Sequence, residues 1–537
     1  MRRLALASLS SLALGLVACG SSTVSEIPDA SMPDAYTPPP PMVSTSLGAV
    51  VGARGNGYQA YLGIPYAEPP VGELRWRAPV ASGPWEGELE ATRAPTACAQ
   101  EAFGFGELGA EDCLYLNVHT PDPLPEDAPV LVWIHGGAFV FGEGLQLDRG
   151  TAGDRLAAEH GVVVVSMNYR LGGFGFLPSD ELGSTGNEGF QDQQLALRWV
   201  RDHIASFGGD PANVTIAGES AGGVSVCLHL LSPGSEGLFA RAITQSGLCD
   251  GALPERSEQL SIAQGAIEAL GCADASDVAA CMRGKTLTEI RESTRLAGEL
   301  LDFLAEGGAR PWPSVDGTVI PGQFRDRLDA GEVADVPLLI GWNLDEGTLF
   351  VGLAEQAGTV VDEAQYHATM ASLASRYGVD VAAVESAYPL SAYADPGAAV
   401  AAAIGHASLA CPSRRAARAL AGRGADVFVY RFEYAEAGFQ LALPRELGAF
   451  HSAEIQFVFG HPSRLGTRAF MGDELALHES MMAYWARFAT SGDPNGGGAV
   501  TWPRFGAESE DALILDTTIR AASGPDRDTC ALWDPPT

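Results

Sequence analysis

Ser220 stands at a predicted sharp turn, with a glycine two residues away on either side. It is the centre of a Gly-Glu-Ser-Ala-Gly sequence at residues 218–222. An apolar run at 214–217 precedes this sequence, and a helical stretch at 224–231 follows it. A strained turn from strand to helix exposes the serine hydroxyl, and the N-terminus of the helix favours negative charge there. We therefore predict a nucleophilic serine, the alternative being a glycine-rich turn without chemistry.

A second glycine-rich segment follows another predicted strand. The apolar run at 130–134 ends in His-Gly-Gly-Ala-Phe at 135–139. Backbone N–H groups in such a loop, with the N–H of the residue after the serine, can bind the oxyanion of a tetrahedral intermediate. The expected donors are Gly137, Ala138 and Ala221, and losing one such donor costs on the order of 3–4 kcal/mol of transition-state stabilisation. The alternative is a purely structural turn.

A serine of this kind needs a base to accept its proton, and histidine is a usual base. The sequence has ten histidines, of which His451 lies downstream of the serine in a small-residue loop at 448–454. The chain order serine, acid, histidine is typical of α/β folds with this turn and favours His451. A structural loop histidine is the alternative for His451. His135, inside the glycine-rich loop, is interpreted as structural.

The acid that orients the histidine is expected between Ser220 and His451. Asp345 and Glu346 follow the predicted strand at 337–340. Either carboxylate could fix the imidazole tautomer and stabilise the imidazolium. The residue types alone leave the choice open, and the unused carboxylate is expected to be solvated or to cap a helix.

The elements that must position these residues alternate between strands and helices. Further apolar runs occur at 162–167 and 427–432, and amphipathic stretches at 191–207 and 259–270. This rhythm predicts an α/β fold with a large, mostly parallel or mixed sheet flanked by helices. Alanine- and charge-rich stretches at 280–330 and 355–425 are predicted to be helical, either as insertions around the site or as outer packing.

The N-terminus is typical of an export signal. Arg2 and Arg3 precede a short apolar stretch at 4–17, and Leu-Val-Ala-Cys-Gly at 16–20 resembles a bacterial lipobox. We predict a signal peptide at residues 1–18, a lipid on Cys19 and a disordered Pro/Ser-rich tether over residues 19–46, with a catalytic domain at 47–537. The protein would then be exported and anchored in the cell envelope, facing the periplasm or the cell surface. A plain cleavable signal is the alternative.

Charge excludes two classes of partner. The sequence has 33 basic and 67 acidic residues, a formal net charge of −34. Such a chain repels phosphate backbones and anionic lipid surfaces, which argues against nucleic-acid binding and against electrostatic membrane docking. Any membrane contact is expected only through the N-terminal lipid.

Nine cysteines include Cys19, so eight remain for disulfides in an exported chain. Eight cysteines allow 105 pairings. No spacing typical of a zinc site occurs, and no metal is predicted. Local spacing suggests two short loops, and a third bond would tie the C-terminal tail to the body: Cys98–Cys113, Cys272–Cys281 and Cys411–Cys530. For Cys227 and Cys249 a fourth disulfide and a buried free thiol are both open.

Longer sequence patterns point to a family. They are Tyr-Leu-Gly-Ile-Pro-Tyr-Ala at 61–67, Glu-Leu-Arg-Trp at 73–76, Glu-Asp-Cys-Leu-Tyr-Leu-Asn at 111–117, Phe-Gly-Gly-Asp-Pro at 207–211, Gln-Ser-Gly at 245–247 and Glu-Ile-Gln-Phe-Val-Phe-Gly at 454–460. With these patterns the chain resembles the type-B carboxylesterase/cholinesterase family of the α/β-hydrolase fold, from about residue 47 to the C-terminus.

The resemblance implies a role for each candidate residue. Ser220 matches the family's nucleophile, Glu346 its acid and His451 its base. Asp345 is therefore not the expected acid. Glu219 matches a buried glutamate beside the nucleophile. The matched oxyanion donors are Gly137, Ala138 and Ala221, and the matched disulfides are Cys98–Cys113, Cys272–Cys281 and Cys411–Cys530.

Three departures from the family pattern bear on specificity. Ala138 replaces a glycine of the oxyanion loop and brings a methyl group into the site. The loop from Cys98 to Cys113 has no tryptophan, which supplies an aromatic face for choline in cholinesterases. Leu349 occupies a position that is aromatic there. Choline esters are therefore not the expected substrates.

These features together predict a serine carboxylesterase that hydrolyses small-molecule esters to acid and alcohol through an acyl-enzyme on Ser220. This chemistry requires no metal or organic cofactor. One alternative is a non-catalytic adhesion or binding module of the same fold. Another is a hydrolase of a related acyl bond in a carbamate, lactone or amide, because one constellation serves several carbonyl substrates.

Overall fold

The computed structural model describes residues 39–102, 106–145, 151–294, 301, 305, 310–435, 443–462 and 469–534. The predicted signal peptide, Cys19 and most of the predicted tether lie outside these residues. Pro40–Thr537 forms one unit, separate from Met1–Pro39.

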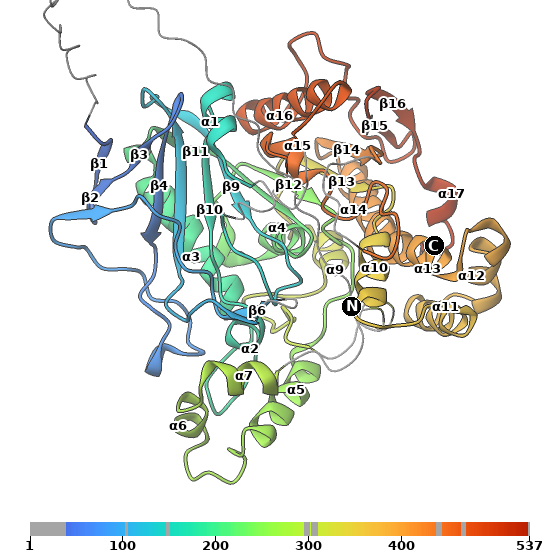
Figure 1. The fold of residues 1–537 in the computed structure, drawn as a ribbon, viewed down its shortest axis with the longest axis horizontal. Coiled ribbons are helices and arrows are strands. Elements are labelled where there is room, and N and C mark those ends of the chain that lie inside the picture. The colour runs from blue at the N-terminus through green and yellow to red at the C-terminus, as the bar shows by residue number, and fades with distance from the viewer. Residues whose placement is uncertain are drawn as a thin grey trace, which may run out of the picture. The chain divides into compact units, whose positions relative to one another are not determined.

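A mixed sheet runs through the unit and comprises eleven strands among the described residues (Figure 1). Seven neighbouring strands run parallel, in the order β15, β14, β13, β12, β11, β9 and β10. Their bounds are β9 Ala128–Ile134, β10 Val163–Met167, β11 Gly209–Glu219, β12 Arg241–Gln245, β13 Leu338–Asn343, β14 Val427–Phe432 and β15 Asp511–Leu515. Antiparallel strands complete the edges: β16 Arg520–Ser523 beside β15, and β8 Tyr115–Pro121, β4 Tyr58–Pro65 and β3 Ala53–Arg54 beyond β10. The predicted α/β fold is confirmed.

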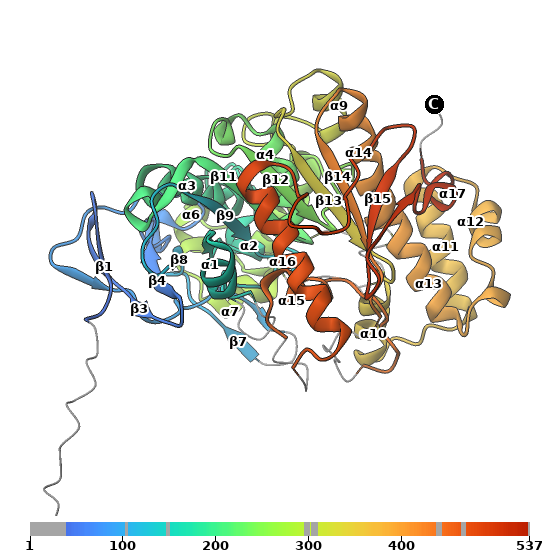
Figure 2. The same cartoon turned by 90° about the horizontal axis from the view of Figure 1, so that it is seen from above.

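Helices cover both faces of the sheet, so central strands such as β9 and β10 consist almost entirely of apolar residues (Figure 2). Along β9, Val130, Val132 and Ile134 pack into one core, while Leu131 and Trp133 pack into the other. The first core is closed by α3 (Glu188–His203), α4 (Ala221–Leu231), α9 (Phe324–Asp329) and α14 (Cys411–Gly422). The second is closed by α1 (Asp154–His160), α15 (Ile455–Phe459) and α16 (Asp473–Ser491).

Two helical clusters extend beyond these layers, each with its own apolar core. One comprises α5 (Arg256–Ala269), α6 (Val278–Arg283) and α7 (Leu287–Ser293). The other comprises α10 (Thr348–Gln356), α11 (Glu363–Tyr377), α12 (Val381–Ala387) and α13 (Pro396–Gly405), which continues through a π-helical turn, η5 (His406–Ala410), into α14. Residues 310–323, predicted to be helical, form a loop instead, because Pro311, Pro313 and Pro321 cannot continue a helix.

The described body begins earlier than the predicted boundary at residue 47. Strand β1 (Met42–Thr45) pairs with β2 (Gly48–Val51), which also pairs with β5 (Glu88–Glu90). Val43 is buried between exposed neighbours, the alternation that a half-buried strand requires. The last residues assigned to the tether are therefore part of the folded body.

Four disulfides join the cysteines of the described residues. They are Cys98–Cys113, Cys227–Cys249, Cys272–Cys281 and Cys411–Cys530. Cys227, left open from the sequence, is thus paired. Disulfides at this density are typical of a protein exported from the reducing cytosol. Within the described ranges, no helix combines the length and apolar character that crossing a bilayer demands.

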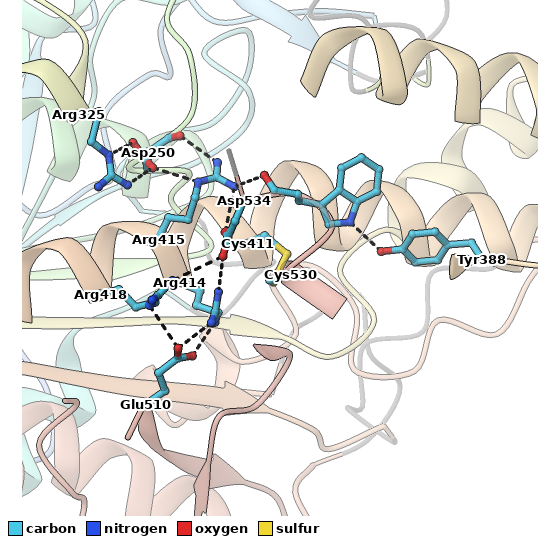
Figure 3. Close-up of polar contacts among 11 residues, drawn as sticks. Asp250, Arg325, Tyr388, Cys411, Arg414, Arg415, Arg418, Glu510, Cys530 and Asp534 are labelled. Atoms are coloured by element: carbon cyan, nitrogen blue, oxygen red, sulfur yellow. Dashed lines mark hydrogen bonds and ion pairs between the residues drawn. A yellow bond between two sulfur atoms is a disulfide. The ribbon is translucent and has the colours of Figure 1, made fainter. Parts of the chain in front are cut away.

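Helix α14 is tied to the C-terminal segment by buried ion pairs and a disulfide (Figure 3). Arg414 donates to both carboxylate oxygens of Glu510, at 2.6 and 2.7 Å, and to Asp534 at 3.0 Å. The Arg414 and Glu510 side chains are 3% and 4% exposed. Cys411, the first residue of α14, is bonded to Cys530. Charge pairing and covalent linkage therefore hold the same helix.

The neighbouring arginine extends these contacts to Asp250 (Figure 3). Arg415 donates to the Asp250 carboxylate at 3.0 Å and to the Trp533 carbonyl at 3.1 Å. Arg325 of α9 donates to the same carboxylate. Asp250 directly follows Cys249, whose disulfide partner lies on α4. The C-terminal segment is thus connected to the helix that follows the predicted nucleophile.

Replacing Glu510 with glutamine should lower the free energy of unfolding by about 3–5 kcal/mol, because it leaves part of a buried arginine charge uncompensated. The matched control is Asp202→Asn, since the Arg201–Asp202 pair is about half exposed and should contribute less than about 1 kcal/mol. Urea unfolding with the disulfides intact measures both. Equal effects of the two substitutions would contradict the structural role of the buried pair.

Candidate active site

The predicted site residues follow strands that end at the same edge of the sheet. Ser220 follows β11, and the loop that begins at His135 follows β9. Glu346 follows β13, which is parallel to both through β12. Because the carboxyl ends of parallel strands lie side by side, residues far apart in the sequence meet there.

Ser220 has the strained backbone that its neighbours predicted. Its φ and ψ are 56° and −123°, and α4 begins at the next residue, earlier than the predicted helix start at 224. The Ser220 N–H donates to the Gln245 carbonyl at 2.9 Å, which fixes the turn to β12. A methyl group at Gly222 would lie 2.0 Å from the Ile134 carbonyl oxygen. Only glycine allows this approach of α4 to β9.

The predicted oxyanion loop, defined as residues 135–145 and called the oxyanion loop below, lies against Ser220. A methyl group at Gly136 would be 3.1 Å from the Cβ of Ser220. Gly137, Ala138 and Phe139 all have positive φ, at 109°, 55° and 59°. The loop therefore turns sharply at the predicted donors, beside the predicted nucleophile.

The third predicted donor, Ala221, is the first residue of α4. The first N–H groups of a helix have no carbonyl acceptor in a preceding turn. The Ala221 N–H is thus one of the groups that a helix start leaves available for a ligand. Its side chain is buried.

His451 and Glu346 are in direct contact. The imidazole Nδ1 lies 2.6 Å from Glu346 Oε2, and both residues are buried. The other carboxylate oxygen accepts from the Ser246 hydroxyl at 2.5 Å and from the Asn343 N–H at 2.8 Å. These bonds fix the carboxylate and hence the orientation of the imidazole.

Asp345, the other carboxylate that the sequence offered, faces the backbone of the histidine loop. Its Oδ2 accepts from the Ala449 N–H at 2.8 Å, and its own N–H donates to the Ala449 carbonyl at 2.9 Å. Asp345 is half-buried, and its carboxylate caps a backbone N–H of this loop and not the start of a helix. It holds the loop in which His451 stands, while Glu346 contacts the imidazole.

Glu219 approaches the opposite side of the imidazole. Its Oε1 lies 3.2 Å from His451 Nε2, and the side chain is 2% exposed. In the described part of the chain no hydrogen bond joins the Ser220 hydroxyl to His451. Catalytic hydrogen bonds often tighten only when substrate binds. The structure thus brings His451 to Glu346 and Glu219, and leaves the serine contact open.

A further buried glutamate lies beneath these residues. Glu454 accepts from Gln245 Nε2 at 2.9 Å and from Asn343 Nδ2 at 2.6 Å. Gln245 in turn accepts from Trp485 Nε1 at 3.0 Å. Burial raises the pKa of Glu454, and the nearby Glu346 charge raises it further.

The charge state of His451 follows from its surroundings. Burial lowers the pKa of His451, but the carboxylates of Glu219, Glu346 and Glu454 outweigh this effect and raise the pKa to about 9. At neutral pH the uncomplexed imidazole is therefore mainly protonated. The neutral imidazole, which can accept the serine proton, becomes more populated as the pH rises.

Aromatic rings border the site. The ring of Phe350 lies 4.8 Å from the His451 ring, centroid to centroid. Leu349, singled out from the sequence, occupies a position that is aromatic in cholinesterases. In the structure the following residue, Phe350, places an aromatic ring beside the imidazole. Phe139 packs edge-on against Trp312, with the centroids 4.7 Å apart. His135 stacks on Tyr169 at 4.3 Å, which agrees with its interpretation as structural.

Sequence reasoning missed three polar residues that hold the site. Ser246 and Asn343 fix Glu346, and Glu454 adds negative charge below the imidazole. Ser246 and Glu454 lie inside patterns that carried the family resemblance, so their position in those patterns was a usable signal. Asn343 had none beyond its place at the end of a strand. Among the described residues, no group of side chains is suited to hold a metal ion.

Comparison with known proteins shows the family of the chain. The model of the Carboxylesterase family matches residues 39–533. The chain therefore belongs to the carboxylesterase family, with its α/β-hydrolase fold, and is a carboxylic ester hydrolase. It is similar to the para-nitrobenzyl esterase of Bacillus subtilis (strain 168), with 33% identity over 512 residues, covering 90% of this chain and 96% of that protein.

Glu219→Gln should move the rising limb of the kcat/KM pH profile to lower pH. The negative charge of Glu219 favours the protonated imidazole, so its removal lowers the pKa of His451 from about 9. Proton release from an uncharged ester, followed in a pH-stat from pH 5 to 10, measures the profile. Glu159→Gln removes an exposed charge and is the control. Coincident limbs for the wild type and Glu219→Gln would refute this electrostatic role.

Proposed function

We propose that the chain hydrolyses carboxylic esters through an acyl-enzyme on Ser220. The Ser220 hydroxyl attacks the carbonyl carbon while His451 accepts its proton. The tetrahedral oxyanion is bound by the N–H groups of Gly137, Ala138 and Ala221. His451 then protonates the leaving alcohol, and water repeats the sequence to release the acid.

The observation that carries this proposal is the contact of His451 with Glu346 at the sheet edge that also presents Ser220. With Nδ1 held by Glu346, proton transfer to and from Ser220 falls to Nε2, which lies 3.2 Å from Glu219 Oε1 in the uncomplexed site. The 2.6 Å separation and the burial of both groups support this role for Glu346. The strained Ser220 backbone supports the role of nucleophile.

The negative charge around the imidazole stabilises the imidazolium that forms during catalysis. During acylation the imidazole becomes a cation, which Glu346 and Glu219 stabilise at 2.6 and 3.2 Å. The same carboxylates hold the proton on the uncomplexed histidine at neutral pH. The fraction of free enzyme with a neutral base increases with pH, so kcat/KM should increase toward alkaline pH.

Small neutral esters fit the proposal better than choline esters. The loop from Cys98 to Cys113 has no tryptophan that could face a choline cation, and Ala138 adds a methyl group to the oxyanion loop. Carbamates, lactones and amides share the carbonyl chemistry and remain alternative substrates. A purely adhesive role is disfavoured, since the chain belongs to an esterase family and retains the serine, histidine and glutamate.

Ser220→Ala should lower kcat for p-nitrophenyl acyl esters by roughly 10⁶-fold, since the nucleophile is lost. A series from acetate to laurate, hydrolysed by residues 20–537, measures turnover and the acyl length accepted. Ser261→Ala, an exposed serine on α5, is the control and should keep full activity. Absence of turnover by folded wild-type protein, or activity surviving in Ser220→Ala, would sink the proposal.

We further propose that the protein is exported and anchored by a lipid on Cys19, with residues 1–18 removed as a signal peptide. The lipobox-like sequence at 16–20 and the short apolar stretch before it support this. The disulfides of the body support export. Residues from 20 to about 41 would serve as the tether to the folded body.

Cys19→Ser should release the enzyme from membranes, because no acyl chain is then attached. Partition of the expressed protein between aqueous and detergent phases measures this, with ester hydrolysis as the assay in each phase. The wild type should enter the detergent phase. Equal partition of both proteins into the aqueous phase would exclude the lipid anchor and favour a plain cleavable signal.

A further inference from the structure

One end of the oxyanion loop is held by the side chain of Gln100. Gln100 Nε2 donates to the Gly142 carbonyl at 3.0 Å, and the Gly142 N–H donates to Gln100 Oε1 at 2.9 Å. One amide side chain thus satisfies both backbone groups of a loop residue. Gly142 has φ of 125°, and a methyl group there would lie 2.3 Å from His135 Nδ1, so the loop is closely fitted at this point.

A second amide holds the loop two residues further on. The Gly144 N–H donates to Asn168 Oδ1 at 2.8 Å, and Asn168 Nδ2 donates to the Thr96 carbonyl at 3.0 Å. Asn168 is 1% exposed. It therefore links the oxyanion loop to the segment that precedes Cys98.

Both amides connect the oxyanion loop to residues 96–100, where the Cys98–Cys113 loop begins. Gln100 belongs to this segment, and Asn168 binds Thr96 within it. Gln100 Nε2 also donates to the Cys98 carbonyl at 3.1 Å. The Ala99 N–H donates to the Ala110 carbonyl at 2.9 Å, and the disulfide closes the same loop. The segment that holds the oxyanion loop is thus itself fixed.

The oxyanion loop needs such support because its backbone is strained. Ala138 and Phe139 have positive φ, a conformation that costs non-glycine residues on the order of 1–3 kcal/mol each. Strain of this kind persists only where surrounding contacts impose it. The Gly137 carbonyl accepts from Val140 and Phe141 within the loop. From outside the loop, the Gly172 N–H donates to the Phe139 carbonyl at 2.7 Å and the Tyr169 hydroxyl to the His135 carbonyl at 2.8 Å. Gln100 and Asn168 hold its later residues, Gly142 and Gly144.

We infer that Gln100 is a positioning residue for the oxyanion hole, holding the N–H groups of Gly137 and Ala138 toward the bound oxyanion from the Cys98–Cys113 loop. This inference rests on the proposed acyl-enzyme function. Gln100 acts through Gly142, so it affects the transition state, in which the oxyanion forms, more than ground-state binding.

Three variants of Gln100 test this role. Gln100→Ala removes both bonds to Gly142 and should lower kcat for p-nitrophenyl acetate by 10- to 100-fold, with KM changed less than about threefold, as expected for a small displacement of catalytic groups. Gln100→Glu keeps the acceptor for the Gly142 N–H and should lose less activity. Gln100→Asn is one methylene shorter, cannot reach as far, and should resemble Gln100→Ala.

A matched control separates positioning from stability. Gln323 holds Leu253 by the same two-bond pattern, with Nε2 to the carbonyl and Oε1 from the N–H, both at 2.9 Å. Gln323 lies at the start of α9, outside the proposed catalytic machinery. Gln323→Ala should lower the melting temperature about as much as Gln100→Ala while kcat stays at the wild-type value.

Affinity for a trifluoromethyl ketone provides an independent readout, because its adduct with the serine carries an oxyanion. The inference predicts that Gln100→Ala weakens this inhibitor by about the same factor as kcat, with Gln100→Glu between it and the wild type. Wild-type kcat and inhibitor affinity in folded Gln100→Ala would overturn the inference. Inactivity of the wild type would instead overturn the proposed function. Should Gln100→Ala not fold, Gln100→Glu and Gln100→Asn give the same comparison.

Discussion

Three buried carboxylates around one imidazole are the constraint on which the site depends. Glu219, Glu346 and Glu454 are each at most 2% exposed. Buried carboxylates are unfavourable unless a positive charge or hydrogen-bond donors compensate them. His451 supplies the charge, and its raised pKa is the other side of that interaction. Electrostatic attraction between the carboxylates and the protonated imidazole therefore holds acid and base together, in addition to the geometry of the chain.

The donors that complete this compensation come from the ends of two neighbouring strands. Gln245 and Ser246 stand at the end of β12, and Asn343 at the end of β13. Through them, Glu346 and Glu454 receive four hydrogen bonds: two from side chains of the first strand end, and the N–H and amide of Asn343 from the second. The parallel register of β12 and β13 is thus a requirement of the electrostatics. A shift in that register would leave buried carboxylates without donors.

The sequence predicted the fold well where a single pattern determines the outcome. Apolar runs predicted five of the parallel strands, β9, β10, β11, β13 and β14, because burial on both faces favours apolar residues, and the glycines around Ser220 predicted the sharp turn. The strand β12, with Arg241, Thr244 and Gln245, carried no such signal. Residue type did not distinguish Asp345 from Glu346, because both are carboxylates and adjacent residues point in different directions. Which of the two contacts the imidazole depends on the exact position where the strand ends. The family resemblance, and then the contacts, made that choice.

Other features depended on contacts between distant segments. The loop at 310–323 was predicted to be helical because the stretch at 280–330 is rich in alanine and charged residues. The prediction gave too little weight to the three prolines within the loop. The end of the tether was placed too late because four residues of β1 form a strand only by pairing with β2. The bonds of Gln100 to Gly142 join residues 42 positions apart, and no local pattern carries such information.

The bond between Cys411 and Cys530 makes a covalent ring of the chain segment between them, 119 positions long. His451 lies inside this ring, whereas Ser220 and Glu346 lie outside it. Ring closure restricts the unfolded segment and contributes on the order of 4–5 kcal/mol in the chain-entropy model. One peptide-bond cut within the ring leaves both fragments covalently joined. A single cut by a protease within the ring therefore leaves His451 attached to the part of the chain that carries Ser220 and Glu346.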